Sequence, residues 1–191
     1  MIWLTADTHF GHASLIETGK RPFRSLSAME RTIIRNINAA VRPKDELYIL
    51  GDFSYRCSAE HAQELREKIF CQKVHLIPGN HDKDWSRPEL AGTFILEDPI
   101  TSFKCDDGRR IVLSHYPLAV WQGLRRGAIQ LHGHIHSGVG EKAPGSYNCR
   151  QRERGLLRYD VGVDANGYAP VSLDQVLAWF SGIEPRYPEG L

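Results

Sequence analysis

Short apolar segments alternate along the chain with segments of helical periodicity. Five stretches rich in Val, Ile and Leu each end in a polar or glycine turn, a pattern that predicts buried strands. Two further strands are expected from 94 to about 104 and from 156 to 163. Strands interleaved with helices predict an α/β layered domain rather than a helical bundle or an all-β sandwich. The five predicted buried strands cover residues 2–6, 46–50, 73–77, 110–113 and 128–131.

Helical patterns fill the intervals between the predicted strands. Ser27 and Glu30 form a capping-box pattern, and apolar residues follow at helical spacing as far as Val41. The sequence therefore predicts an amphipathic helix that begins after Ser27. A second helix is expected to begin after Ser58 and to run to about Phe70.

Two shorter helices and one irregular stretch complete the pattern. A short helix is expected to follow Ser86, and a C-terminal helix is expected where Ser172 and Gln175 form another capping box. Residues 137–155 are rich in Gly, Pro and Arg and lack apolar periodicity. We expect them to form a surface loop or flap.

Composition narrows the class of protein. The 191 residues, 41% of them hydrophobic, predict a single globular domain over residues 1–191. Lys and Arg total 24 against 23 Asp and Glu, which gives no overall attraction to nucleic acid or to an anionic membrane. The four cysteines lie far apart without CxxC pairs, as expected for reduced thiols in a cytoplasm. The first apolar stretch is too short for a signal peptide or a membrane span, so a cytoplasmic protein is expected.

Metal-binding types of side chain follow the predicted strands. In open α/β sheets, sites form beyond the carboxyl ends of the strands, where loops distant in sequence meet. Residues two apart in an extended segment project to the same side, as expected for the Asp7 and His9 pair and for His134 and His136. The side chains placed in this way are Asp7, His9, Asp52, Asn80, His81, Asp82, His115, His134 and His136.

This set of side chains suits two divalent cations. Cations about 3.5–4 Å apart need a bridging ligand, and a carboxylate serves because both of its oxygens coordinate. We predict that Asp52 is this bridge. Imidazole and carboxylate ligands without thiolate favour Mn, Fe, Zn or Ni, and manganese is the first metal to test.

The motif order Asp-x-His, Gly-Asp, Gly-Asn-His-Asp, His and Gly-His-x-His resembles the calcineurin-like metallophosphoesterase superfamily, most closely its small prokaryotic and phage members. The resemblance implies a four-layer αββα sandwich with two mixed β-sheets face to face and helices outside both. It also implies a role for each residue. Asp7, His9 and His136 hold one metal, Asp52 bridges, Asn80, His115 and His134 hold the second, His81 is the proton donor, and Asp82 orients the His81 ring or raises its basicity.

The activity expected from this resemblance is hydrolysis of a small phosphate ester. The substrate is a phosphomonoester or phosphodiester, with nucleotides and cyclic phosphates among the candidates. A metal-bridging hydroxide would attack phosphorus while His81 protonates the leaving group. The alternatives are a nuclease acting on oligonucleotides and a non-catalytic protein-binding scaffold on the same fold. The sequence leaves the oligomeric state open.

Several residues near the motifs have more than one interpretation. His12 and Arg21 are candidate substrate contacts, although loop packing accounts equally well for His12 and a solvated guanidinium is favoured for Arg21. His132 is expected to support the site or the core, and the turn at Asp164 either closes a loop or lines the cleft. The basic residues of 138–158 form a modest patch for which nucleic-acid contact is not favoured. Structural roles are expected for His61 and His75.

Overall fold

Two mixed β-sheets face each other in the computed structural model, which describes all residues except 19, 139–145 and 188–191. The first sheet contains, in spatial order, β4 (Ile95–Leu96), β3 (Lys73–Ile77), β2 (Glu46–Leu50), β1 (Ile2–Thr5) and β9 (Val171–Ser172). Its strands are parallel except β9, which pairs antiparallel with β1. The second sheet contains β5 (Ile100–Lys104), β6 (Arg110–Ser114), β7 (Ile129–His132) and β8 (Arg158–Asp160), with only β5 antiparallel to its neighbour.

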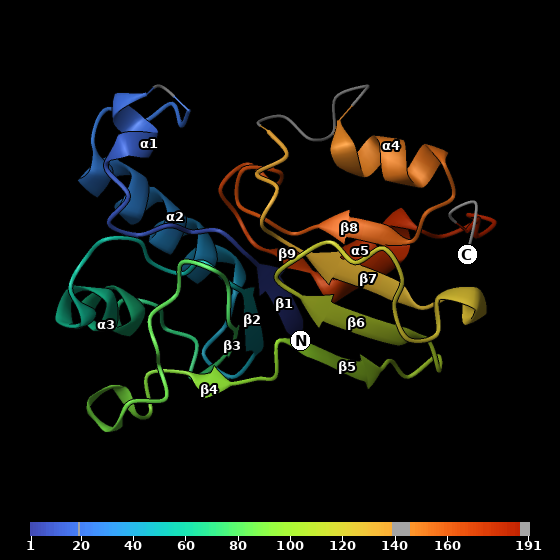
Figure 1. Cartoon of the computed structure of the whole chain (residues 1–191), viewed down its shortest axis with the longest axis horizontal. Helices are drawn as coiled ribbons and strands as arrows, with labels where there is room; N and C mark the ends of the chain where they lie inside the picture. The colour runs from blue at the N-terminus through green and yellow to red at the C-terminus, as the bar shows by residue number, and fades with distance from the viewer. Residues whose placement is uncertain (19, 139–145, 188–191) are drawn as a thin grey trace.

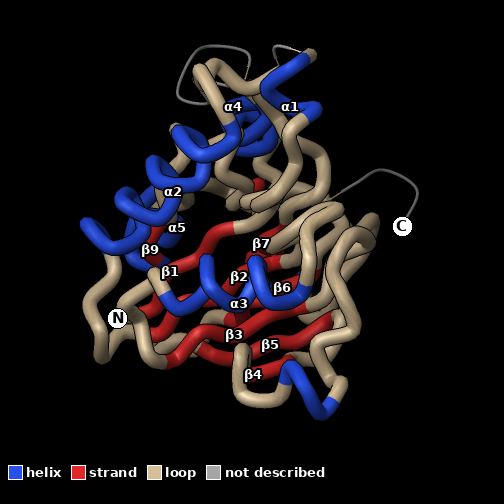
Figure 2. The backbone as a smooth tube through the Cα atoms, turned by 90° about the vertical axis from the view of Figure 1, so that its left-hand side faces the viewer, coloured by secondary structure: helices blue, strands red, loops and turns tan. Residues whose placement is uncertain are grey.

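Helices cover the outer face of the first sheet and pack on β8 of the second. In Figure 1, α2 and α3 lie beside β1 to β3, whereas α4 lies over β8. Figure 2 shows the strands running through the middle of the molecule with helices around them. The helices are α1 (Ser14–Glu17), α2 (Leu26–Ala40), α3 (Ala59–Glu67), α4 (Tyr147–Glu153) and α5 (Leu173–Trp179), with 3₁₀ turns η1 (Pro88–Leu90) and η2 (Leu124–Arg126).

Strand β2 shows why two separate cores form. Successive side chains of a strand point to opposite faces of the sheet. Leu47 and Ile49 pack against the helices, in a cluster that includes Met29 and Ile33 of α2. Leu50 points to the other side, into a cluster between the two sheets. Both faces of the first sheet are therefore apolar and covered, and the predicted α/β architecture with two mixed sheets and helices is confirmed.

The helix caps agree with the sequence in two places and differ in one. The side chain of Ser58 accepts from the backbone amide of His61, and the capping box of Ser172 with Gln175 is present. The predicted capping box at Ser27 is wrong, because the N-cap of α2 is Ser25. The Glu30 side chain is buried, and its carboxylate accepts from the amide of Gly11 in the loop after β1 instead of capping the helix.

The predicted strand from 94 to about 104 is two strands in different sheets. The chain leaves the first sheet after β4 and enters the second sheet at β5. Pro99 lies between them, and a proline lacks the N–H that an uninterrupted ladder needs. The predicted strand at 156–163 is likewise shorter, since only Arg158–Asp160 pairs as β8. The short helix expected after Ser86 is the 3₁₀ turn at Pro88–Leu90.

The predicted loop at 137–155 contains a helix. Ser146 caps α4 by accepting from the amide of Cys149, and Asn148 and Gln151 are buried beneath it. The buried face of α4 is polar, which explains why an apolar periodicity did not reveal it. The rest of the predicted flap, residues 139–145, lies outside the described residues. In the part of the chain that is described, no helix has both the length and the apolar character needed to cross a bilayer.

Candidate metal centre

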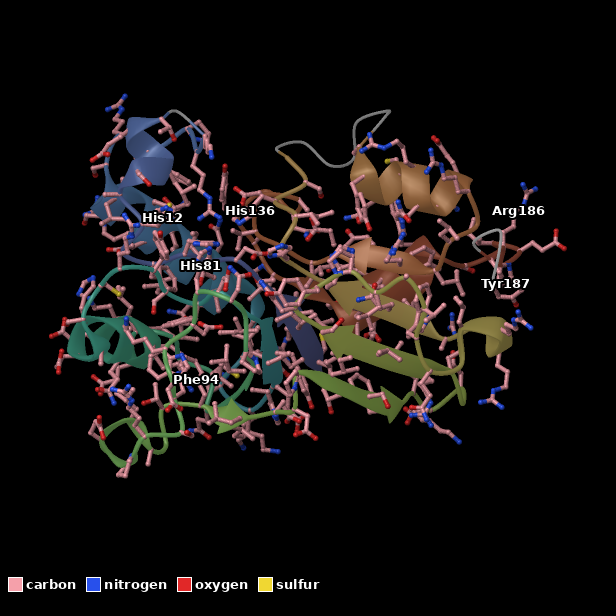
Figure 3. All side chains as sticks on the ribbon, viewed as in Figure 1. His12, His81, Phe94, His136, Arg186 and Tyr187 are labelled. Carbon is pink, nitrogen blue, oxygen red and sulfur yellow. The ribbon has the colours of Figure 1, made fainter. Side chains whose placement is uncertain are left out.

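The predicted motifs meet beyond the carboxyl ends of the parallel strands. Figure 3 shows His12, His81 and His136 near one another, although they come from segments after β1, β3 and β7. The parallel strands bring their ends to the same edge, so the following turns converge there. Asp7, Asp52 and Asn80 follow β1, β2 and β3, whereas His115, His134 and His136 follow β6 and β7.

Many of the converging residues have a left-handed backbone. Non-glycine residues adopt a positive φ rarely, and the conformation costs about 1–3 kcal/mol each unless the surroundings hold it. Such strain is characteristic of functional sites. The residues concerned are Asp7 with φ 57°, His9 with 50°, Asp52 with 55°, His134 with 72° and His136 with 45°.

Three glycines allow the close approach of these turns. A Cβ atom on Gly79 would meet the Asp52 carboxylate, and a Cβ on Gly133 would meet the carboxylate of Asp7. A Cβ on Gly51 would meet the His115 ring, and this glycine also has a φ of 85°. The glycines of the Gly-Asp, Gly-Asn and Gly-His motifs thus make room for the site's side chains, and only Gly51 among the three also needs a positive φ.

A first group of donor atoms comprises Asp7, His9 and His136. The Oδ1 atom of Asp7 lies 4.0 Å from Nε2 of His9 and 3.9 Å from Nε2 of His136. Both Asp7 Oδ1 and His9 Nε2 are buried without a hydrogen-bond partner among the described residues. Buried polar atoms are rarely left unsatisfied, and these two face each other across a space that suits a cation.

A second group comprises Asn80, His115 and His134 beside Asp52. The His115 Nδ1 atom lies 2.9 Å from the Leu50 carbonyl, so Nδ1 carries the proton and Nε2 presents a lone pair. This Nε2 lies 3.0 Å from the Asn80 Oδ1 and 3.2 Å from the His134 Nδ1. Imidazole nitrogen and amide oxygen are donor types that divalent cations accept, so the atoms that meet here suit a second cation.

Asp52 lies between the two groups. Its Oδ2 atom is 3.4 Å from Nε2 of His9 and 3.6 Å from Nε2 of His115. Burial acts to raise the pKa of Asp52, but the nearby rings of His9 and His115 and the hydrogen bond from the His81 amide outweigh it and hold the pKa at about 2. Asp7 differs, because burial and the nearby Asp160 raise its pKa well above the usual value.

The buried charges of the site do not balance without cations. Asp7, Asp52, Asp160 and Asp164 are each less than a tenth exposed, and Arg21 is the buried guanidinium among them. Burying an unpaired carboxylate is costly, so carboxylates gathered in this way pair with cations or metals. The donor set therefore fits a pair of divalent cations held by nitrogen and oxygen ligands.

Arg21 supports the site from inside the protein. Its Nε and Nη2 atoms donate to Asp164 at 2.9 and 2.7 Å, and further bonds go to the carbonyls of Thr8 and Asp7. Asp164 in turn lies 2.7 Å from the His136 Nδ1, which leaves Nε2 of that ring toward Asp7. The guanidinium is thus occupied by protein acceptors, and the predicted substrate contact of Arg21 stays a prediction.

The Arg21 ion pair should contribute strongly to stability. Substituting Arg21→Met is expected to lower the free energy of unfolding by about 3–5 kcal/mol, because it takes the guanidinium away from the buried Asp164 carboxylate and from the Thr8 and Asp7 carbonyls. Urea denaturation of the metal-free protein measures this. The matched control is Arg35→Met on the exposed face of α2, which should change stability by less than about 0.5 kcal/mol. Equal losses in the two variants would contradict the prediction.

His81 and Asp82 lie in different surroundings. The His81 side chain is exposed at the rim of the site, with its ring 5.5 Å from the His9 ring. Both Asp82 oxygens accept from backbone amides, those of Asp52, Phe53 and Gly79, at 2.8 to 2.9 Å. Asp82 therefore holds the Asp52 and Gly79 turns together, whereas the sequence predicted that it orients the His81 ring. The role of His81 as proton donor stays a prediction.

His12 contacts a predicted ligand directly. Its Nδ1 atom lies 3.1 Å from Nδ1 of His9, and its ring packs on Tyr55 with centroids 4.1 Å apart. Burial, with a contribution from His9, lowers the pKa of His12 to about 4, and one hydrogen bond joins the Nδ1 atoms of the two rings. This bond turns the unpartnered Nε2 of His9 toward the acidic ligands. Tyr55, which also packs 4.6 Å from His81, had no sequence signal because it lies in an irregular loop.

A cavity of about 450 Å³ opens beside the first donor group. The residues that line it include His12, Lys20, His81 and His136, with Leu15 contributing apolar surface. A volume of this size accommodates a small organic phosphate. His12 thus has access to a bound molecule, and its predicted substrate contact stays a prediction.

The remaining histidines have structural partners. His132 is fully buried, with Nδ1 bonded to the Gly133 carbonyl and Nε2 to the Tyr147 hydroxyl. His75 lies 2.7 Å from the Glu97 carboxylate. His61 on α3 lies near the carboxylates of Glu30 and Glu64. Both interpretations of Asp164 hold: the residue lies in a turn, and it lines the cavity.

The basic stretch after His136 is partly used inside the protein. Arg152 donates to the Trp179 carbonyl, and Arg158 donates to the Leu118 carbonyl and to Gln151. Lys142 lies outside the described residues. Two arginines of the predicted patch therefore hold α4 and β8 in place.

Comparison with known proteins agrees with this geometry. Residues 1–145 match the calcineurin-like phosphoesterase family. The uncharacterized protein MJ1445 of Methanocaldococcus jannaschii is 32% identical over 177 residues, which cover 92% of this chain and 89% of that protein. The chain belongs to the calcineurin-like phosphoesterase family.

Two solved structures are similar to this chain to different extents. A protein of unknown function from Aquifex aeolicus, AQ665, superposes with a TM-score of 0.70 at 24% identity, covering 93% of this chain and 98% of the other. The Pseudomonas putida nuclease MPE gives a TM-score of 0.46 at 25% identity, covering 71% and 60%. The first supports the fold alone.

Proposed function

We propose that this chain is a dinuclear metal-dependent hydrolase of phosphate esters. The observation that carries the proposal is the pair of donor groups with Asp52 between them, both built from turns at strand ends. The unpartnered atoms of Asp7 and His9 support it independently. Membership of the calcineurin-like phosphoesterase family supports the reaction class.

Each part of the chain has a role in this proposal. When bound, two divalent cations would lower the pKa of a water molecule and neutralise charge on the phosphate. Asp7, His9 and His136 would hold one cation, whereas Asn80, His115 and His134 would hold the other, with Asp52 shared between them. Asp82 fixes the spacing of the Asp52 and Gly79 turns through their amides.

His81 is the residue proposed to move a proton. Its ring lines the cavity and is exposed, so it can reach the leaving oxygen of a bound ester. A histidine in the protonated form donates to a leaving alkoxide and contributes about 10²–10⁴-fold to the rate. The His81 amide also bonds to Asp52 at 2.8 Å, which fixes the residue relative to the cations.

Metal loading and a substrate panel test the proposal together. Isothermal titration of the metal-free protein with Mn²⁺ is expected to give two equivalents per chain. Activity should then be compared on aryl monoesters, aryl diesters, 2′,3′-cyclic nucleotides and oligonucleotides. Hydrolysis of a small ester would support the proposal, whereas cleavage of oligonucleotides alone would make the chain a nuclease. Two bound equivalents without any hydrolysis would favour a non-catalytic scaffold.

A further inference from the structure

We infer that Asp160 is a positioning residue for the metal site of Asp7, His9 and His136, and that α4 is part of the support of this site. The inference rests on the proposed dinuclear centre. Asp160 lies at the end of β8 and is fully buried, although the proposed reaction does not use it. Its carboxylate instead contacts the loop that carries His136.

The carboxylate of Asp160 holds the residue next to a ligand. Its Oδ2 atom accepts from the Ser137 hydroxyl at 2.5 Å and from the Ser137 amide at 3.3 Å. Its Oδ1 atom accepts from the Gly162 amide at 2.8 Å. The loop after β7 is therefore fixed immediately beyond His136.

Helix α4 holds Asp160 in turn. The Asn148 side chain accepts from the Asp160 amide at 2.8 Å and donates to the Asp160 carbonyl at 3.0 Å. Asn148 is almost fully buried, so both bonds are sheltered from water. These two hydrogen bonds connect α4 through the backbone of β8 to the loop of the metal site.

Asp160 and Asp164, which lie four residues apart, contact successive residues of that loop. Asp164 holds the His136 ring and Asp160 holds Ser137. Held at both points, His136 keeps its left-handed backbone, with φ 45°, and its Nε2 faces Asp7. Loss of either contact would free a strained residue to relax away from the metal.

Asp160 also places negative charge close to Asp7. Gly162 separates the two carboxylates, and a Cβ on this glycine would lie 2.9 Å from Asp160 Oδ1 and 3.0 Å from Asp7 Oδ2. A second carboxylate at this range attracts a cation to the first site even without coordinating it. Asp160 is therefore expected to act through position and through charge.

Two substitutions separate these contributions. Asp160→Asn removes the charge and keeps one of the two acceptor oxygens, whereas Ser137→Ala keeps the charge and removes the hydroxyl contact, leaving the longer bond from the Ser137 amide. Ser137→Thr restores the hydroxyl. Asn38→Ala is the control, because Asn38 also bonds to two backbone groups, at Lys68 and Phe70, far from the site.

The readout is Mn²⁺ titration with electron paramagnetic resonance, which distinguishes a coupled pair from a single ion. Asp160→Asn and Ser137→Ala are expected to weaken one of two Mn²⁺ equivalents by about 10–100-fold and to leave the other within about threefold. Ser137→Thr should recover most of the loss, and Asn38→Ala should retain both affinities. Thermal unfolding of the metal-free variants records any general destabilisation.

The possible results separate this inference from the proposed function. Two tight equivalents in the wild type with unchanged affinities in both variants would overturn the inference alone. Equal weakening of both equivalents, in proportion to lost thermal stability, would also overturn it. If Asp160→Asn does not fold, Ser137→Ala decides by the same criteria. A wild type that binds fewer than two equivalents would overturn the proposed function and this inference with it.

Discussion

Asp52→Asn is expected to reduce turnover by about a thousandfold with manganese present. Asp52 lies within 3.6 Å of a nitrogen from each donor group, so in the proposed centre the substitution would remove the negative charge that both cations would share. Losing several kcal/mol of electrostatic stabilisation corresponds to a fall of this size. An asparagine tolerates the φ of 55° and still accepts from the His81 amide, so the shape of the turn is retained.

Metal titration should accompany the rate measurement for Asp52→Asn. We expect the coupled Mn²⁺ pair to be lost and one equivalent to weaken strongly. Asp174→Asn, an exposed substitution on the first turn of α5, is the matched control and should retain full turnover. Turnover of Asp52→Asn within tenfold of the wild type would show that Asp52 is not the shared ligand.

His81→Ala is expected to have the second largest effect, a fall of about 10²–10⁴-fold on an alkyl ester. An alkoxide needs a proton as it leaves, and the exposed His81 ring lines the cavity where the ester would lie. Nitrophenolate leaves without one, so the loss with a nitrophenyl ester should be much smaller. Steady-state kinetics on the two esters measure the difference.

The metal content of His81→Ala should be unchanged, because the ring belongs to neither donor group. His61→Ala is the control, since His61 is two-fifths exposed on α3 and lies outside the site. An equal loss of turnover on both esters would rule out proton donation as the role of His81.

The sequence predicted the layers and the meeting point of the motifs because both depend on local pattern. Short apolar strands such as Lys73–Ile77 are recognised directly from the sequence, and each motif begins immediately after its strand. Parallel pairing then brings the turns together without further information. The prediction of a single strand from 94 to 104 was wrong because the chain passes from the first sheet to the second at Pro99. The periodicity of the sequence does not reveal such a change of sheet.

The supporting contacts were less visible in the sequence. Arg21 and Asp164 are 143 residues apart, so nothing in the order of residues reveals that they pair. Asp82 follows His81 directly, which suggested that it acts on that ring, yet its oxygens bond to the amides of a distant turn. The polar residues Asn148 and Gln151 concealed the buried face of α4, because they satisfy hydrogen bonds where an apolar side chain usually packs.

The left-handed backbone of the ligand turns bears on how the protein is prepared. Without ions, the chain must hold strained residues and crowded carboxylates by itself, so chelating agents in a purification buffer would loosen this end of the molecule. Ligands that bind only the folded state stabilise it by a free energy that grows with the logarithm of their concentration above the dissociation constant. Manganese added from cell lysis onward should therefore raise the yield and lengthen the storage life of the protein.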